Sequence, residues 1–306
     1  MDAPVATTVT HRALRAVNGL ASAAGSRGWC AALAGVLEAT AEKPGNVHPR
    51  RAFPDLTYDD LVAAATAIAP AMDRAVTTRL GRTIRDAVEA ARTAVDTNAN
   101  LGIVLLTAPL AAVPDGVALD AAAVDDVLAS LDAADASDVW QAIAVARPGG
   151  LGRVDRDDTH GPPPGDLRAA MRAAADRDLI ARMWAEGFGP LFTGAVADLR
   201  AALAAGVPPL DAIVDCHLRQ LAREPDSLIV RRHGPAAARE VSAGAAAILR
   251  LPPAERPTAV AAFDDALRSP RRLNPGTTAD VVAAALYILL RSGDLLPQLR
   301  PAVASS

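Results

Sequence analysis

Aromatic residues make up only 3% of this 306-residue chain, although 51% of its residues are hydrophobic. A core must therefore be built mainly from Ala, Leu and Val, and such small side chains suit closely packed helices. No segment shows the alternation of apolar and polar residues that is typical of a half-buried strand. The sequence predicts an all-α fold, and helical patterning on both sides of residues 147–166 favours a single domain over residues 1–306.

The chain also has few cysteines and no excess of positive charge. Cys30 and Cys216 stand apart without CxxC spacing, which is typical of buried thiols rather than of a zinc site or disulfide framework. A net charge of −4 argues against a general nucleic-acid partner. The N-terminus lacks the pattern of a secretory signal, and the longest apolar runs, at 101–113 and 281–290, are too short to span a bilayer. We expect a cytoplasmic protein with no membrane partner.

Several common catalytic motifs are absent. There is no G-x-x-x-x-G-K-[ST] sequence and no G-x-G-x-x-G after a strand, which argues against P-loop and Rossmann nucleotide sites. No G-x-S-x-G context surrounds Ser227 or Ser242, and the histidines lack H-E-x-x-H spacing. His217 lies in an expected helix and is interpreted as structural.

What the chain has in abundance is helical periodicity. Residues 80–95 repeat apolar side chains with a period near 3.6, which predicts an amphipathic helix. Thr57 with Asp60, and Thr277 with Asp280, resemble capping boxes at two helix starts. Similar patterns predict further helices at 11–40, 58–75, 120–131, 136–145, 166–185, 192–205, 209–223, 235–249, 256–268 and 278–292.

Five polar segments interrupt this helical pattern, at 38–49, 96–102, 146–161, 223–234 and 271–280. Each alone is compatible with an ordinary turn, because Asn, Asp, Gly and Pro are turn residues. Together they offer amides, cations and carboxylates in several loops, which suits a polyphosphate bound with Mg²⁺. The carboxylates include Asp157 and Asp158, the expected metal ligands.

The order of these segments resembles the triphosphoribosyl-dephospho-CoA synthase family, the CitG-like proteins. The resemblance runs from "EATAEKPGNVHP" through "TNANLG" and "PGGLG" to "PDSLIVRRHG" and "NPGTTAD". It implies an all-α transferase that uses ATP as the ribosyl donor. The 2′-hydroxyl of 3′-dephospho-CoA attacks C1′ of the ATP ribose, adenine leaves, and a triphosphoribosyl product forms.

The resemblance also implies roles for individual residues. It assigns catalysis to three carboxylates and nucleotide binding to residues of the turn motifs. The expected catalytic residues are Glu38, Asp226 and Asp280, and the expected nucleotide-binding residues are Lys43, Gly45, Asn46, Asn98, Asn100, Arg231 and Asn274.

Two motifs depart from the citrate-lyase branch of the family. "TNANLG" stands where that branch carries an Asn-Thr-His-Lys-Gly motif, and "RAFPDLTYDDL" replaces a Gly-Ser/Ala-His-x-Asp-Met stretch. In this respect the chain resembles the branch found in archaea and methylotrophic bacteria. A second hypothesis is therefore ribosyl or nucleotide transfer in tetrahydromethanopterin-type C1 cofactor biosynthesis, and a third is a non-catalytic nucleotide-binding protein. A homodimer is compatible with all three.

Overall fold

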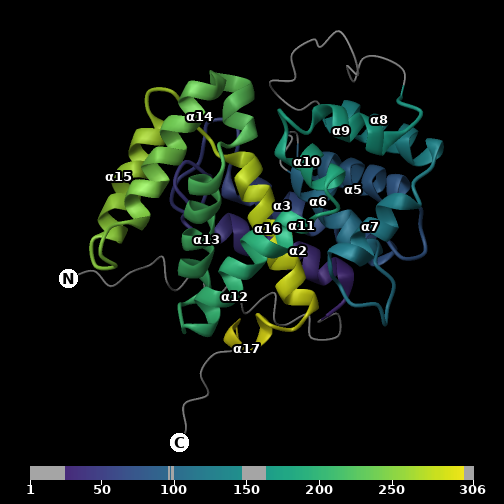
Figure 1. The fold of residues 1–306 in the computed structure, drawn as a ribbon, viewed down its shortest axis with the longest axis horizontal. Helices are drawn as coiled ribbons and strands as arrows, with labels where there is room; N and C mark the ends of the chain where they lie inside the picture. The colour runs from purple at the N-terminus through teal and green to yellow at the C-terminus, as the bar shows by residue number, and fades with distance from the viewer. Residues whose placement is uncertain (1–24, 96, 98–99, 147–162, 300–306) are drawn as a thin grey trace, which may run out of the picture.

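The computed structural model describes residues 25–95, 97, 100–146 and 163–299, and these residues form a helical protein (Figure 1). Within them there is no β-strand, only isolated bridges between His48 and Arg51 and between Phe53 and Leu56. The predicted all-α class is confirmed. The helices are α2 (Arg27–Thr40), α3 (Tyr58–Ala67), α4 (Ala69–Asp73), α5 (Leu80–Ala94), α6 (Leu101–Ala112), α7 (Ala121–Ala129), α8 (Ala133–Ala146), α9 (Leu167–Ala174), α10 (Leu179–Ala185), α11 (Gly189–Leu191), the π-helical turn η1 (Phe192–Val196), α12 (Ala197–Ala204), α13 (Pro209–Arg223), α14 (Ser227–Leu249), α15 (Arg256–Arg268), α16 (Gly276–Arg291) and α17 (Leu296–Leu299).

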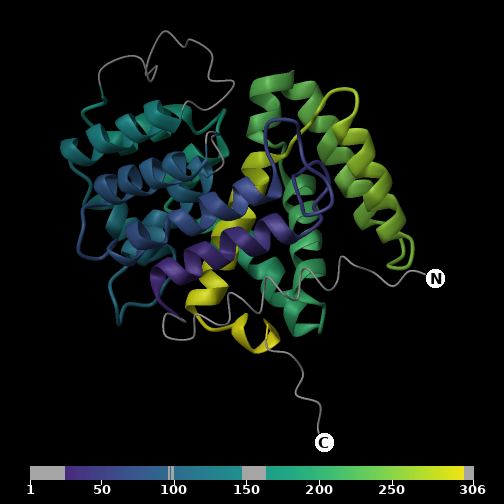
Figure 2. The same ribbon diagram turned by 180° about the vertical axis from the view of Figure 1, so that it is seen from behind.

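Helices α16 and α2 form the centre of the molecule. Thirteen of the 16 residues of α16 and 12 of the 14 residues of α2 are buried. A helix that is apolar on all sides must be covered on all sides. Accordingly, α16 runs through the middle of Figure 1 with α13–α15 on one side and α5–α10 on the other. Figure 2, the view from behind, shows the purple helix α2 crossing in front of α16.

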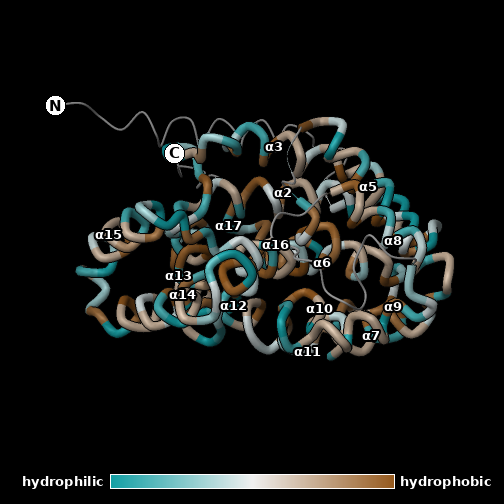
Figure 3. Tube along the Cα trace, turned by 90° about the horizontal axis from the view of Figure 1, so that it is seen from above, coloured by the Kyte–Doolittle hydropathy of each residue, from teal (hydrophilic) through white to brown (hydrophobic). Residues whose placement is uncertain are grey.

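Helices α13, α14 and α15 enclose a second, smaller hydrophobic cluster beside the main core. Helix α14 is kinked at Gly234, which has φ 84° and ψ 164° and precedes Pro235. The helix predicted at 235–249 corresponds to the part of α14 that follows this kink, and a shorter helical segment at 227–233 precedes it. Figure 3 places α15 at the edge of the molecule, where hydrophilic residues alternate with hydrophobic ones.

One of the two predicted capping boxes is present. Thr57 and Asp60 exchange both capping hydrogen bonds at the start of α3. The prediction for Thr277 and Asp280 was wrong, because α16 begins at Gly276 and its Thr278 N–H donates instead to Asp226 of another helix. Both cysteines are buried free thiols, as expected. None of the described helices is long and apolar enough to cross a membrane.

Candidate active site

Helix ends from distant parts of the chain meet beside the N-terminus of α16, and Asp226 joins two of them. Its Oδ1 accepts from Ile229 N at 3.0 Å and so caps α14. Its Oδ2 accepts from both the backbone N and the Oγ1 of Thr278 on α16, each at 2.8 Å. Burial raises the pKa of Asp226, and these donors oppose the rise. Asp226 thus holds the α14 and α16 N-termini together with both of its oxygens occupied.

An ion pair between Glu38 and Lys43 lies at the other side of this junction. Lys43 is the only lysine in the chain, and its side chain is completely buried. Its Nζ lies 2.8 Å from Glu38 Oε1 and also donates to the carbonyl oxygens of Glu38 and Ala41. Because burying two charges costs more free energy than their attraction usually returns, such a pair is better explained by function than by stability.

The turn after Lys43 approaches the loop before α16. Gly45 adopts φ 79°, and a Cβ on it would lie 2.8 Å from Leu273 O, so only glycine fits this turn. Asn46 Nδ2 donates to Asn274 Oδ1 at 2.7 Å, and its own Oδ1 is buried without a partner. The first and last polar segments of the sequence, more than 200 residues apart, therefore form one wall of the site.

Asp280 lies on the first turns of α16 and contacts the start of α6. A Cβ on Gly102 would overlap the Asp280 carboxyl group, so the two helices approach as closely as a glycine permits. Asp280 forms no hydrogen bond or ion pair with any other described residue. Burial raises its pKa well above the ordinary value, and the nearby Glu38 and Asp226 carboxylates raise it further. The Asp280 carboxyl therefore holds a proton at pH values at which an ordinary aspartate is ionised.

Arg231, on α14, lies near the carboxyl groups of Asp226 and Asp280. It forms an ion pair with Asp178, whose Oδ1 also caps α10 through Ile180 N at 2.9 Å. The guanidinium opposes the rise in the pKa of both Asp226 and Asp280. Asp178 is a residue that sequence reasoning missed, because a lone Asp before a helix signals only a cap.

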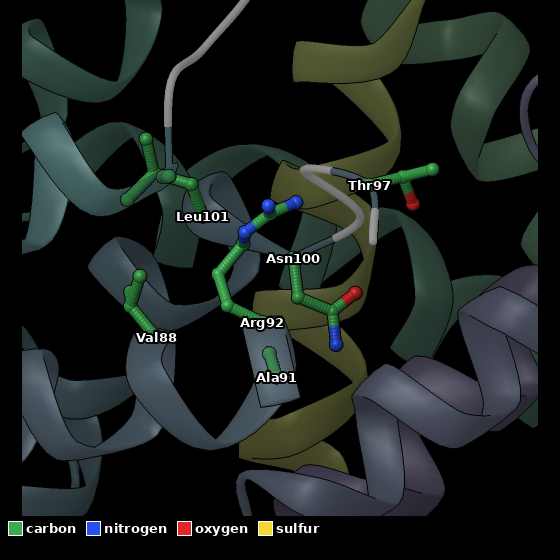
Figure 4. A pocket seen from close by; sticks show the side chains of 7 residues that line it. Val88, Ala91, Arg92, Thr97, Asn100 and Leu101 are labelled. Atoms are coloured by element: carbon green, nitrogen blue, oxygen red, sulfur yellow. The ribbon is translucent and has the colours of Figure 1, made fainter. Parts of the chain in front are cut away.

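The second polar segment contributes Asn100, the residue before α6. Asn100 is 3% exposed, and its Nδ2 has no hydrogen-bond partner. It lines a small pocket together with Arg92 of α5, and Figure 4 shows Arg92 extending toward the residues that open α6. The other half-buried arginines of the described ranges have an acidic partner within 4 Å, whereas Arg92 has none among the described residues. Sequence reasoning did not single out Arg92, because it is one of several charged residues on the polar face of the amphipathic helix at 80–95.

Two histidines lie beside the turn that contains Lys43. His217 is fully buried on α13, and burial with the nearby Lys43 charge lowers its pKa well below the usual value. Burial also lowers the pKa of His48 to about 4. Both imidazoles are therefore neutral at physiological pH.

Three of the predicted site residues, Asn98, Asp157 and Asp158, lie outside the described residues. The other nine, Glu38, Lys43, Gly45, Asn46, Asn100, Asp226, Arg231, Asn274 and Asp280, lie around the junction of α2, α6, α14 and α16. Within the described ranges, no group of three or more His, Cys, Asp or Glu side chains is placed to hold a metal ion.

The fold and this site define an all-α protein with acidic groups and unpaired polar groups at converging helix ends. Residues 24–298 match the model of the CitG family, described as ATP:dephospho-CoA triphosphoribosyl transferase, and the chain belongs to this family. The family match confirms the predicted transferase class. A comparison with curated proteins found no match.

A solved structure shares the fold. It is that of a protein from Archaeoglobus fulgidus described as a candidate triphosphoribosyl-dephospho-CoA synthase. The two chains superpose with a TM-score of 0.59 at 23% identity, over 76% of this chain and 99% of the other.

Proposed function

We propose that the chain transfers the triphosphoribosyl group of MgATP to the 2′-hydroxyl of 3′-dephospho-CoA at the junction of α2, α6, α14 and α16. The observation that supports this most directly is a pair of carboxyl groups in contrasting surroundings. Glu38 forms an ion pair with Lys43, whereas burial and acidic neighbours raise the pKa of Asp280 well above its ordinary value. A carboxyl group whose pKa is raised in this way suits a general acid, and a second carboxylate nearby suits the base.

The reaction breaks the bond between C1′ and the adenine nitrogen and forms a bond between C1′ and the acceptor oxygen. We assign to Asp280 the donation of a proton to the departing adenine. Glu38 takes the proton of the attacking hydroxyl, and its negative charge stabilises the oxocarbenium-like ribose in between. Protons therefore balance, because one carboxyl group gives the proton that the other receives.

We assign the triphosphate to the start of α6. The unpaired Arg92, the buried Asn100 amide and the N-terminal end of this 12-residue helix all favour an anion there. Arg231 and the turn formed by Lys43, Gly45 and Asn46 complete the nucleotide-binding set, with Asn274 and Asn98.

Mg²⁺ fits this site as part of MgATP. Both oxygens of Asp226 accept hydrogen bonds and Glu38 is paired with Lys43, and no group of three or more described carboxylates forms a cage of its own. A magnesium ion bound to a nucleotide keeps phosphate and water ligands and needs only one or two protein carboxylates. Asp157 and Asp158 remain the proposed protein ligands. Asp226 is proposed to position the catalytic groups rather than to exchange protons.

The test is adenine release, measured by mass spectrometry, when the protein is incubated with MgATP and 3′-dephospho-CoA. We expect release that depends on the acceptor and that falls by about 10² to 10⁴-fold in Asp280→Asn. Adenine release only with a pterin-type acceptor would assign the chain to C1 cofactor biosynthesis instead. MgATP binding without release for any acceptor would favour the non-catalytic hypothesis.

A further inference from the structure

Helix α15 reaches the site through one buried carboxylate, Asp264. Asp264 and Leu267 are the two buried residues of α15. The Oδ1 of Asp264 accepts from Gly45 N at 2.7 Å, and both oxygens accept from Arg268 Nε at 2.9 Å. Asp264 thus bonds an otherwise exposed helix to the turn carrying Lys43, and its Oδ2 also accepts from Arg51 Nη1 at 2.7 Å.

Arg268, one turn later on the same helix, binds a second peptide group of that turn. Its Nη2 donates to the backbone carbonyl of Asn46, and its guanidinium lies 5.0 Å from the centre of the Phe53 ring. The N–H of Gly45 and the carbonyl of Asn46 are therefore both bonded to a single Asp–Arg pair. In a turn these backbone groups have no hydrogen-bond partner within a helix, so they need partners from elsewhere in the structure.

A role in stability alone does not explain this pair. Well-packed apolar residues stabilise a protein as well as a buried ion pair does, and they need no matched geometry. An Asp–Arg pair adds directional hydrogen bonds, because a carboxylate and a planar guanidinium bind their partners in a narrow range of geometries. This geometry matters here because the turn that the pair binds determines the positions of Lys43 and Asn46.

We propose that Asp264 and Arg268 are positioning residues that set the active-site turn, so that Lys43 meets Glu38 and Asn46 meets Asn274. Neither side chain contacts the substrate in this assignment; both act through the turn. The catalytic consequence rests on the proposed function, whereas the structural consequence can be measured without any reaction.

Lys43 allows that measurement, because it is the only lysine in the chain and is completely buried. The full-length protein is treated with an amine-acylating reagent, and modification of the peptide containing Lys43 is followed by mass spectrometry. We expect the rate to rise about tenfold or more in Asp264→Asn and in Arg268→Lys, since each removes charged hydrogen bonds that hold the turn. The buried thiols of Cys30 and Cys216, followed in the same samples, should stay unreactive.

Asp265→Asn is the matched control. Asp265 neighbours Asp264 on the same helix and also pairs with Arg51, but its side chain is 69% exposed and does not contact the turn. This variant should keep Lys43 protected and adenine release unchanged. In the two positioning variants, adenine release per enzyme should fall about 10- to 100-fold, because small displacements of catalytic groups have large kinetic effects.

The outcomes separate the two proposals. If the wild-type protein releases no adenine but Lys43 becomes reactive only in the Asp264 and Arg268 variants, the positioning role stands and the proposed function fails. Lys43 that stays protected in both variants, with wild-type adenine release, would overturn the positioning role alone. If both the thiols and Lys43 become reactive in these variants, the positioning role is also overturned, because the Asp264–Arg268 pair would then be needed for folding rather than for placing the turn.

Discussion

Asp280→Asn should make the folded protein more stable at neutral pH while removing its activity. In the unfolded chain this carboxyl ionises near the ordinary value of 3.8, whereas in the folded chain its pKa is raised well above that value. Between the two, the unfolded state binds fewer protons than the folded state, so the stability of the wild-type protein falls as pH rises. Asparagine has nearly the same shape, cannot ionise, and deprives no described residue of a hydrogen-bond or ion-pair partner.

The size of the effect follows from proton linkage. The advantage of the variant in unfolding free energy should grow by about 1.4 kcal/mol for each pH unit above 3.8. It should level off once the pH passes the pKa of Asp280 in the folded chain, so the break in the curve measures that pKa. Below 3.8 the two proteins should be equally stable, because Asp280 is then protonated in both states.

Urea unfolding of both proteins at intervals between about pH 4 and pH 8 provides the assay. Parallel stability curves for the wild-type protein and the variant would refute the reasoning, because they would mean that folding does not change the proton affinity of Asp280. The activity of the wild-type protein should decline on the alkaline side as Asp280 loses its proton, and adenine release measured over the same range checks this.

Three further predictions concern the turn and the pocket. Lys43→Met should lower the free energy of unfolding, measured in urea, by about 3–5 kcal/mol, because it leaves Glu38 buried without a counterion. If Glu38→Gln introduced into the same variant does not restore stability, this reasoning is contradicted. Gly45→Ala should lower the melting temperature more than Gly206→Ala, since the two glycines share a positive φ but only Gly45 is crowded; equal losses would count against the close approach. Arg92→Gln should raise the KM for MgATP about tenfold with a stability change within about 0.5 kcal/mol, and an unchanged KM would remove Arg92 from the triphosphate site.

Sequence patterns were sufficient for the local features of this protein. Helical periodicity with few aromatic residues predicts the all-α class, because a helix repeats its buried face within a few residues. The order of polar segments likewise indicated the family, and it selected Lys43, Asn46 and Asp280 as candidate site residues. The predictions of fold class and family are confirmed because each depends on neighbours in the chain or on a family pattern written in the sequence.

Other features depend on contacts that no local pattern encodes. Asp264 is separated from Gly45 by 219 residues, and its hydrogen bond to that glycine exists only because α15 folds back onto the turn. The role of Asp226 was interpreted as catalytic, yet its oxygens are taken up by Ile229 and Thr278.

The raised pKa of Asp280 is likewise a property of the tertiary structure. Its pKa depends on burial and on the approach of Glu38 and Asp226 from two other helices. The amino-acid sequence by itself determined the helical class, the family and most of the chemical groups at the site. Only the tertiary structure decided which of those groups are paired, which are protonated and which hold the others in place, because charge and hydrogen bonding depend on distances between segments that are remote in the chain.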